Sequence, residues 1–148
     1  MTTYFVDTSA LFKRYVPEEG SEWLDQLLTD GTQVFISTLT IVELASNLQR
    51  LQSVDRLIDQ SQFSDAWAAF SLDLAAGRLE VVGVSPAVVD MATRLLMDRY
   101  ITPIDAIQLS TALYLGEDAI VVSSDHKMNS LVRALGMGFV DPARAARP

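Results

Sequence analysis

Five short apolar runs, separated by stretches long enough to form helices, constrain the fold of this chain most strongly. Several of the runs contain large or β-branched residues throughout, which is typical of strands buried on both faces. Parallel strands need a crossover, usually a helix, between one strand and the next. The alternation therefore predicts one α/β domain with a parallel sheet covered on both faces. The expected strands are residues 3–6, 33–37, 79–84, 119–123 and 138–140.

The stretches between these strands carry helix signals. Ser85-Pro86 and Thr102-Pro103 each combine an N-cap residue with proline at the first helical position. An aromatic stripe within residues 60–77 is expected to face the core, although it also fits a surface that binds a partner. This stripe comprises Phe63, Trp67, Phe70 and Leu74. The expected helices are 8–15, 21–30, 38–52, 60–77 and 126–135, with two more beginning at 86 and 103.

Composition narrows the class of protein. The chain has 148 residues, 49% of them hydrophobic and 20% charged, so it can bury a sizeable core and is not of the disordered class. The absence of cysteine excludes disulfides, thiol nucleophiles and thiolate zinc sites. No apolar run has the roughly 20 residues of a membrane span, and a secretory signal pattern is missing, so we expect a cytoplasmic protein. We expect the domain to occupy residues 1–141 and residues 142–148 to form a loose tail.

Two acids stand just after predicted strands. Asp7 ends the first strand, and Asp125 follows the fourth. In open parallel sheets ligands bind beyond the carboxyl ends of the strands, so these carboxylates are expected to converge. Glu43 lies in the first turns of the helix after the second strand, and Asp105 lies in the first turn of the helix TPIDAIQL. Each acid also has a structural interpretation, because Asp125 and Asp105 fit helix caps and Glu43 fits a solvated surface.

Four segments, in this order, resemble the PIN-domain family, and most closely its VapC-type toxins. The resemblance implies a five-stranded parallel sheet with helices on both faces, in a divalent-metal ribonuclease. It also implies a homodimer and a cognate VapB-type antitoxin as partner. The family acids fall on Asp7, Glu43, Asp105 and Asp125. The segments are FVDTSALFKRYVPEEGSE, STLTIVELASNL, ITPIDAIQLSTALYLG and IVVSSDHKMNSLVRALG.

The same resemblance implies two hydroxyl residues that orient these carboxylates. Ser9 stands two residues after Asp7, where the family has a small hydroxyl residue. Ser123 stands two residues before Asp125, where the family often has threonine. Serine keeps the hydroxyl, although its looser rotamer weakens the hydrogen bond it can give.

Four crowded carboxylates repel one another, and such oxygen ligands suit Mg²⁺ or Mn²⁺. A metal ion would activate water and offset charge that develops on a phosphate. The hypothesis is in-line attack of water on an RNA phosphodiester, leaving a 5′-phosphate and a 3′-hydroxyl. Asp7, Asp105 and Asp125 are the expected metal ligands, and Glu43 is either a ligand or orients the attacking water.

The net charge of −8 argues against a broad cationic surface for nucleic acid. Local positive charge must then come from the metal or from a few clustered cations. Lys13 and Arg14 are candidates for holding flanking RNA phosphates, although such a pair is usually only solvated. His126, beside Asp125, is more typical of a surface residue than of a general base.

Other small α/β proteins with acidic pockets fit less well. A response-regulator receiver domain expects paired acids after the first strand and an aspartate after the third, but VDTS has one acid and EVVGVSP ends without one. A haloacid-dehalogenase phosphatase needs D-x-D, and Ser9 stands in place of the second acid. Two alternatives within the PIN family stay open. One is a housekeeping nuclease without an antitoxin, and the other is a non-catalytic module that only binds.

Overall fold

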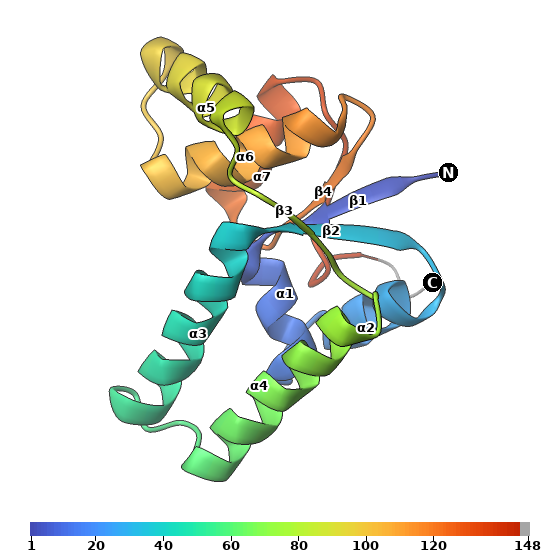
Figure 1. The fold of residues 1–148 in the computed structure, drawn as a ribbon, viewed down its shortest axis with the longest axis vertical. Helices are drawn as coiled ribbons and strands as arrows, with labels where there is room; N and C mark the ends of the chain where they lie inside the picture. Colours follow the sequence, from blue (N-terminus) through green and yellow to red (C-terminus); the bar gives the residue numbers. More distant parts are fainter. Residues whose placement is uncertain (146–148) are drawn as a thin grey trace.

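A five-stranded parallel sheet forms the centre of the molecule (Figure 1). The computed structural model describes residues 1–145. Neighbouring strands pair in the order β3-β2-β1-β4-β5, and every pairing is parallel. This confirms the predicted sheet, with three strands slightly shorter than their apolar runs. The strands are β1 Thr3–Val6, β2 Gln33–Ser37, β3 Glu80–Val82, β4 Ile120–Val122 and β5 Phe139–Val140.

Helices cover both faces of the sheet. In Figure 1, α1 to α4 lie on one side, and α5, α6 and α7 lie on the other. The predicted caps are confirmed, because the side chains of Ser85 and Thr102 accept hydrogen bonds from the first turns of α5 and α6. Among residues 1–145, no helix combines the length and apolarity needed to cross a bilayer. The helices are α1 Thr8–Tyr15, α2 Ser21–Thr29, α3 Thr38–Ser53, α4 Gln60–Ala75, α5 Pro86–Asp98, α6 Pro103–Leu115 and α7 His126–Ala134.

The two faces of β1 enter two different core clusters. Val6 packs into a cluster with α1 to α4, whereas Phe5 packs with Leu109 and Met128 of α6 and α7. Both strand residues are at most 1% exposed. Because neither face meets water, the run TYFV shows no alternation of polar and apolar residues. Asp7, the first charged side chain of the sequence, therefore stands at the end of a strand that is covered on both faces.

The aromatic stripe of α4 faces the core, as expected. Phe70 is buried, and Phe63, Trp67 and Leu74 are partly buried against the same cluster. The Phe70 ring lies 5.3 Å from the Trp67 ring and 5.5 Å from the Tyr15 ring of α1. Such pairs add to the burial of apolar area that holds α4 on the domain.

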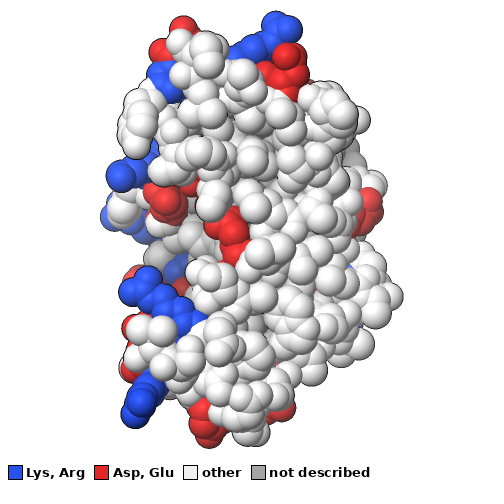
Figure 2. Space-filling model, turned by 60° about the vertical axis from the view of Figure 1, so that its left-hand side comes forward, with Lys and Arg blue, Asp and Glu red and all other residues white. Residues whose placement is uncertain are grey.

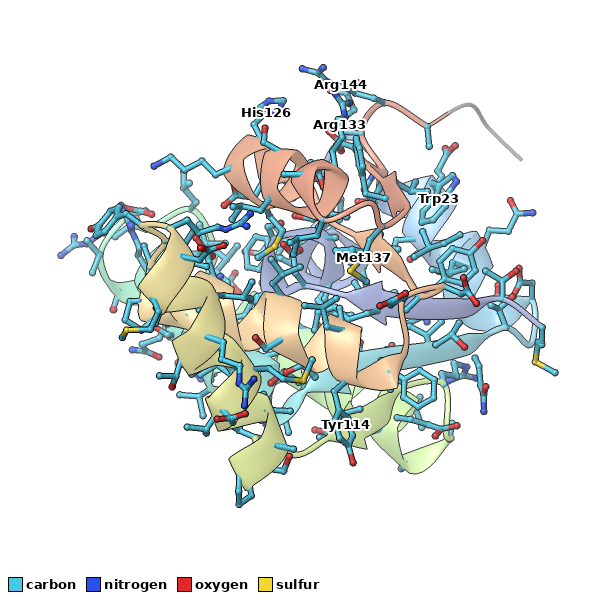
Figure 3. The ribbon with its side chains drawn as sticks, turned by 90° about the horizontal axis from the view of Figure 1, so that it is seen from above. Trp23, Tyr114, His126, Arg133, Met137 and Arg144 are labelled. Carbon is cyan, nitrogen blue, oxygen red and sulfur yellow. The ribbon has the colours of Figure 1, made fainter. Side chains whose placement is uncertain are left out.

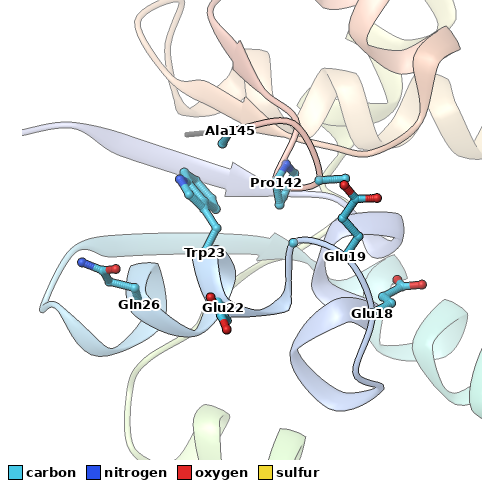
Figure 4. A pocket seen from close by; sticks show the side chains of 9 residues that line it. Glu18, Glu19, Glu22, Trp23, Gln26, Pro142 and Ala145 are labelled. Atoms are coloured by element: carbon cyan, nitrogen blue, oxygen red, sulfur yellow. The ribbon is translucent and has the colours of Figure 1, made fainter. Parts of the chain in front are cut away.

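The chain after β5 packs against the loop before α2 (Figure 4). Pro142 is buried, and the backbone of Ala143 closely approaches Gly20. Gly20 has a φ of 96°, and a Cβ there would lie 2.8 Å from the Ala143 nitrogen, so only glycine fits. A cavity of about 500 Å³ lies between α2 and this segment. Pro142 and Ala143, the first two residues of the expected loose tail, are thus packed, whereas Arg144 is exposed. Residues 146–148 lie outside the described part.

Candidate active site

Asp7 is buried at the carboxyl end of β1, where it begins α1. It is 5% exposed, and its Oδ1 accepts hydrogen bonds from the Ala10 backbone N–H at 3.0 Å and the Ser9 hydroxyl at 2.7 Å. The Ser123 hydroxyl donates to the other oxygen, Oδ2. Ser9 and Ser123 therefore contact the carboxylate that the family resemblance assigned to them. Asp7 is both a helix cap and a carboxylate fixed by three donors.

The buried position changes the acidity of Asp7. Burial raises its pKa to about 6, although the hydrogen bonds from Ser123, Ser9 and Ala10 favour the ionised form. The negative charge of Asp125 raises the pKa further. A cation beside Asp7 would offset both effects, because it would favour the ionised carboxylate.

Asp125 lies close by, after β4, and begins α7. Its Oδ1 accepts hydrogen bonds from the backbone of Lys127 at 2.8 Å and of Met128 at 3.3 Å. The Ser123 hydroxyl also accepts from the Asp125 backbone N–H at 3.1 Å, so this serine contacts both acids. The structural interpretation of Asp125 as a cap is confirmed, and it does not compete with a functional one. One residue can begin a helix and still present a carboxylate at the sheet edge.

Glu43 joins this edge from α3 and is held by a polar network. Its Oε1 accepts hydrogen bonds from the Thr8 hydroxyl and from the Gln108 amide, each at 2.8 Å. Gln108 also donates to the Thr40 hydroxyl at 2.9 Å. The network ties α1, α3 and α6 together around one carboxylate. The solvated surface expected for Glu43 alone is therefore wrong, since the side chain is half-buried and hydrogen-bonded.

Sequence reasoning missed Thr8, Thr40 and Gln108 as members of the site. A usable signal existed for Gln108, which stands one turn after Asp105 and therefore on the same face of α6. Thr40 likewise precedes Glu43 by one turn on α3. Thr8 had no such signal, because its contact with Glu43 depends on how α1 packs against α3.

Asp105 completes the set from the first turn of α6. Its backbone N–H donates to the Thr102 hydroxyl at 3.2 Å, so the cap is present. Its side chain lines a pocket of about 150 Å³ together with Asp7, Glu43 and Asp125. Figure 2 brings forward the side from which α3 and α6 begin and shows acidic side chains near its centre, with Lys and Arg toward its left-hand edge. Carboxylates from four separate elements thus line one pocket.

The donor set of this pocket fits Mg²⁺ or Mn²⁺ held partly through water. All the charged donors are carboxylate oxygens, the ligands that these ions prefer. Among residues 1–145, no three Asp, Glu, His or Cys side chains are grouped closely enough to hold one ion directly. Mg²⁺ usually keeps several waters and contacts one or two carboxylates, so direct ligation by three is not required.

The two cations proposed for phosphate binding are engaged inside the protein. Lys13 is 8% exposed, and its Nζ lies 3.2 Å from Glu18. Arg14 lies 3.1 Å from Asp73 and 3.0 Å from Asp25. Neither residue lines the acid pocket. Their role in RNA binding stays a prediction, and these ion pairs do not favour it.

Comparisons with known proteins identify the family of the chain and agree with its fold. The family model described as PIN domain matches residues 4–133. The fold is similar to DNA-bound VapBC from Salmonella typhimurium, with a TM-score of 0.67 and 16% identity over 96% of this chain and 99% of that one. It is similar to FitAcB from Neisseria gonorrhoeae, with a TM-score of 0.68 and 19% identity over 96% of this chain and 99% of that one.

A third solved structure is the sarcin-ricin loop cleaving toxin VapC20 from Mycobacterium tuberculosis. Its TM-score is 0.63, with 16% identity over 86% of this chain and 94% of that one. No curated protein matches this chain in sequence. At these identities the solved structures show the fold, and the family model covers most of the sequence. The chain belongs to the PIN-domain family.

Proposed function

We propose that the chain is a cytoplasmic, Mg²⁺- or Mn²⁺-dependent endoribonuclease. The observation that carries the proposal is the convergence of Asp7, Glu43, Asp105 and Asp125 on one pocket. These acids come from four different elements, and each element is positioned by the sheet or by helix packing. A bound divalent ion would lower the pKa of water and offset negative charge developing on the phosphate.

Some side chains of this pocket orient the carboxylates, and one carboxylate oxygen accepts a proton. Ser9 and Ser123 fix the rotamer of Asp7, so that its oxygens face the pocket in one arrangement. Thr8 and Gln108 hold one oxygen of Glu43. The other oxygen is the group we assign to accept a proton from the attacking water. In-line attack of the water oxygen on phosphorus then breaks the bond from phosphorus to the 3′ oxygen, which takes a proton from solvent. One product carries a 5′-phosphate and the other a 3′-hydroxyl.

The test is cleavage of single-stranded RNA by the full chain, with Mn²⁺ and with a chelator. Asp7→Asn and Asp125→Asn should each lower the rate by at least two orders of magnitude, because each removes a charge that holds the metal. Asp118→Asn is the matched control, since Asp118 is exposed and precedes β4 at the opposite end of the strand. Cleavage that continues in the chelator, or equal rates in all three variants, would refute the proposal.

We further propose that the nuclease is the toxin of a toxin–antitoxin pair and works as a homodimer. The similarity in fold to the solved structures of VapBC and FitAcB supports the toxin–antitoxin assignment. The homodimer rests on the family resemblance alone. An antitoxin segment that places Arg or Lys among the acids would supply the positive charge that the pocket otherwise takes from the metal. Housekeeping nuclease and binding-only module are the alternatives.

Co-expression with the product of a neighbouring short reading frame tests the partner. A toxin should be captured with that product and should lose RNA cleavage in the complex. If no neighbouring product binds, the toxin assignment fails and the nuclease assignment stands. If the complex forms and the chain never cleaves RNA with Mn²⁺ after release, the binding-only module is correct.

A further inference from the structure

A second, larger cavity adjoins the acid pocket on the far side of Asp105. It has a volume of about 510 Å³ and lies between the loop that joins α5 to α6 and the first turns of α7. Asp105 lines both cavities, so a chain passing over this residue would enter both. The cavity has an apolar floor formed by Ile101 and Leu131, which pack on the small core cluster beneath.

The rim of this cavity carries an aromatic side chain with no packing role. Tyr100 is 95% exposed, so its ring is almost fully in water. A fully exposed ring gains no free energy from burial, whereas a planar partner would cover it. The other strongly exposed tyrosine, Tyr114, is 55% exposed and lies on the opposite side of the view in Figure 3 from His126, the first residue of α7.

The opposite wall of the cavity carries a positive charge. Lys127 is exposed and has no carboxylate within ion-pair distance among residues 1–145. Of the nine other lysines and arginines among residues 1–145, seven engage carboxylates, as Lys13 and Arg14 do. Lys127, Ser130 and Leu131 share one face of α7 at helical spacing, and all three line the cavity. The lysine stands two residues after Asp125, beside the site of cleavage.

We propose that this cavity binds one nucleotide of the RNA strand next to the phosphate that is cut. The base stacks on Tyr100 above the apolar floor, and Lys127 contacts the phosphate of that nucleotide. The inference rests on the proposed function, because it assigns the path of the same substrate. Only an unpaired base can enter, since bases in a duplex remain stacked on their neighbours. The subsite therefore gives the nuclease a preference for single strands.

The charge of the protein supports this assignment. With a net charge of −8, the chain repels RNA at long range, so local contacts must hold the strand. Stacking needs no cationic surface, and one unpaired ammonium supplies a local phosphate contact. A cavity of this size is also large enough for a nucleobase with its ribose, whereas the acid pocket of about 150 Å³ is not.

Binding of a short fluorescein-labelled single-stranded RNA to the full chain in a chelator tests the subsite without cleavage. Tyr100→Ala should weaken binding about fivefold to a hundredfold, the range for loss of one stacked base. Tyr100→Phe should bind as wild type, because it keeps the ring. Tyr114→Ala is the matched control and should also bind as wild type. Circular dichroism checks that each variant is folded.

Lys127→Gln gives a readout that a merely structural role would not change. The slope of log K against log salt concentration should become shallower by about 0.7, the value for one phosphate contact on a single strand. Tyr100→Ala should leave that slope unchanged. Double-stranded RNA of the same sequence should bind more weakly than the single strand and should be insensitive to Tyr100→Ala.

The inference is overturned if Tyr100→Ala and Lys127→Gln bind the single strand as wild type does, or if Tyr114→Ala weakens binding equally. It is also overturned if the two substitutions weaken only the binding of a protein partner, since the cavity would then be a protein-binding site. Failure of the proposed function looks different, because the chain would bind RNA in this Tyr100-dependent way and not cut it with Mn²⁺. A chain that binds no RNA refutes both.

Discussion

The two buried aspartates of this protein lie in opposite surroundings. Asp73 on α4 is 2% exposed, and its carboxylate accepts hydrogen bonds from Arg14, Tyr15 and Arg78. Burial alone would raise its pKa, but these partners hold the pKa of Asp73 below its ordinary value. Asp7 is 5% exposed and has hydroxyl and backbone donors, with no cation among its partners in residues 1–145.

We propose that this difference separates a structural carboxylate, Asp73, from a functional one, Asp7. Asp73 is neutralised by side chains of the protein, and it ties α4 to α1. Asp7 is held in place as firmly but is left without a counter-charge, beside Asp125, which repels it. An arrangement that lowers stability in the free protein and would be relieved by a cation is common at active sites. We therefore interpret the acid pocket as a place for an ion that the protein does not itself supply.

Removal of the structural carboxylate should have the largest effect on stability. Asp73→Ala leaves Arg14, Tyr15 and Arg78 without their shared acceptor, and should lower the free energy of unfolding by about 3–5 kcal/mol, the range for breaking a buried ion pair. Urea denaturation measures this change in the free energy of unfolding. Asp25→Ala is the control. Asp25 is a half-exposed partner of Arg14, so its loss should lower the free energy of unfolding by no more than about 1 kcal/mol. Equal losses in the two variants would contradict the contrast.

The pH dependence of stability should show the next largest effect. The folded pKa of Asp7, about 6, is higher than the ordinary value of 3.8, so the folded state binds the proton more tightly than the unfolded state. This stabilisation is complete below pH 4 and is lost as the pH rises through about 6, by on the order of 3 kcal/mol. Asp73 acts in the other direction, since its stabilisation is lost as the pH falls below 4.

Denaturation of the metal-free protein at several pH values measures both effects. Asp7→Asn should remove the loss of stability between pH 4 and 6 and leave the acid limb below pH 4 unchanged. If the wild type and the variant have parallel profiles between pH 4 and 6, the pKa of Asp7 is not raised and the contrast fails.

The sequence predicted every strand and helix, because apolar runs and caps such as Ser85 and Thr102 act locally. The sequence also predicted that Asp7 and Asp125 lie at one edge of the sheet, because the carboxyl ends of parallel strands meet there. It could not predict that Arg14 pairs with Asp73, which is far along the chain and reaches α1 only through helix packing. The packing of Pro142 and Ala143 on Gly20 was missed for the same reason.

The polar network around Glu43 offers a smaller test of the acid pocket. Gln108→Met keeps the size of the side chain and removes the amide that donates to Glu43 and Thr40. Cleavage should fall about 10- to 100-fold, the usual effect of losing a group that orients a metal-site carboxylate. Ser110→Ala on the same helix is the control, because the Ser110 hydroxyl has no hydrogen-bond partner among the described residues. Equal rates for Gln108→Met and wild type would remove Gln108 from the site.

The most direct test of the account is the unfolding free energy of wild type and Asp7→Asn at neutral pH, with and without Mn²⁺. We predict that Mn²⁺ stabilises the wild type, by about 2.7 kcal/mol at a concentration one hundred times its Kd, because it binds only the folded state. Without metal, Asp7→Asn should be at least as stable as wild type, since the buried charge is gone, and Mn²⁺ should add little to it. A variant that is less stable by about 0.5–2 kcal/mol, as for a lost helix cap, and that gains as much from Mn²⁺ as the wild type would contradict the metal site.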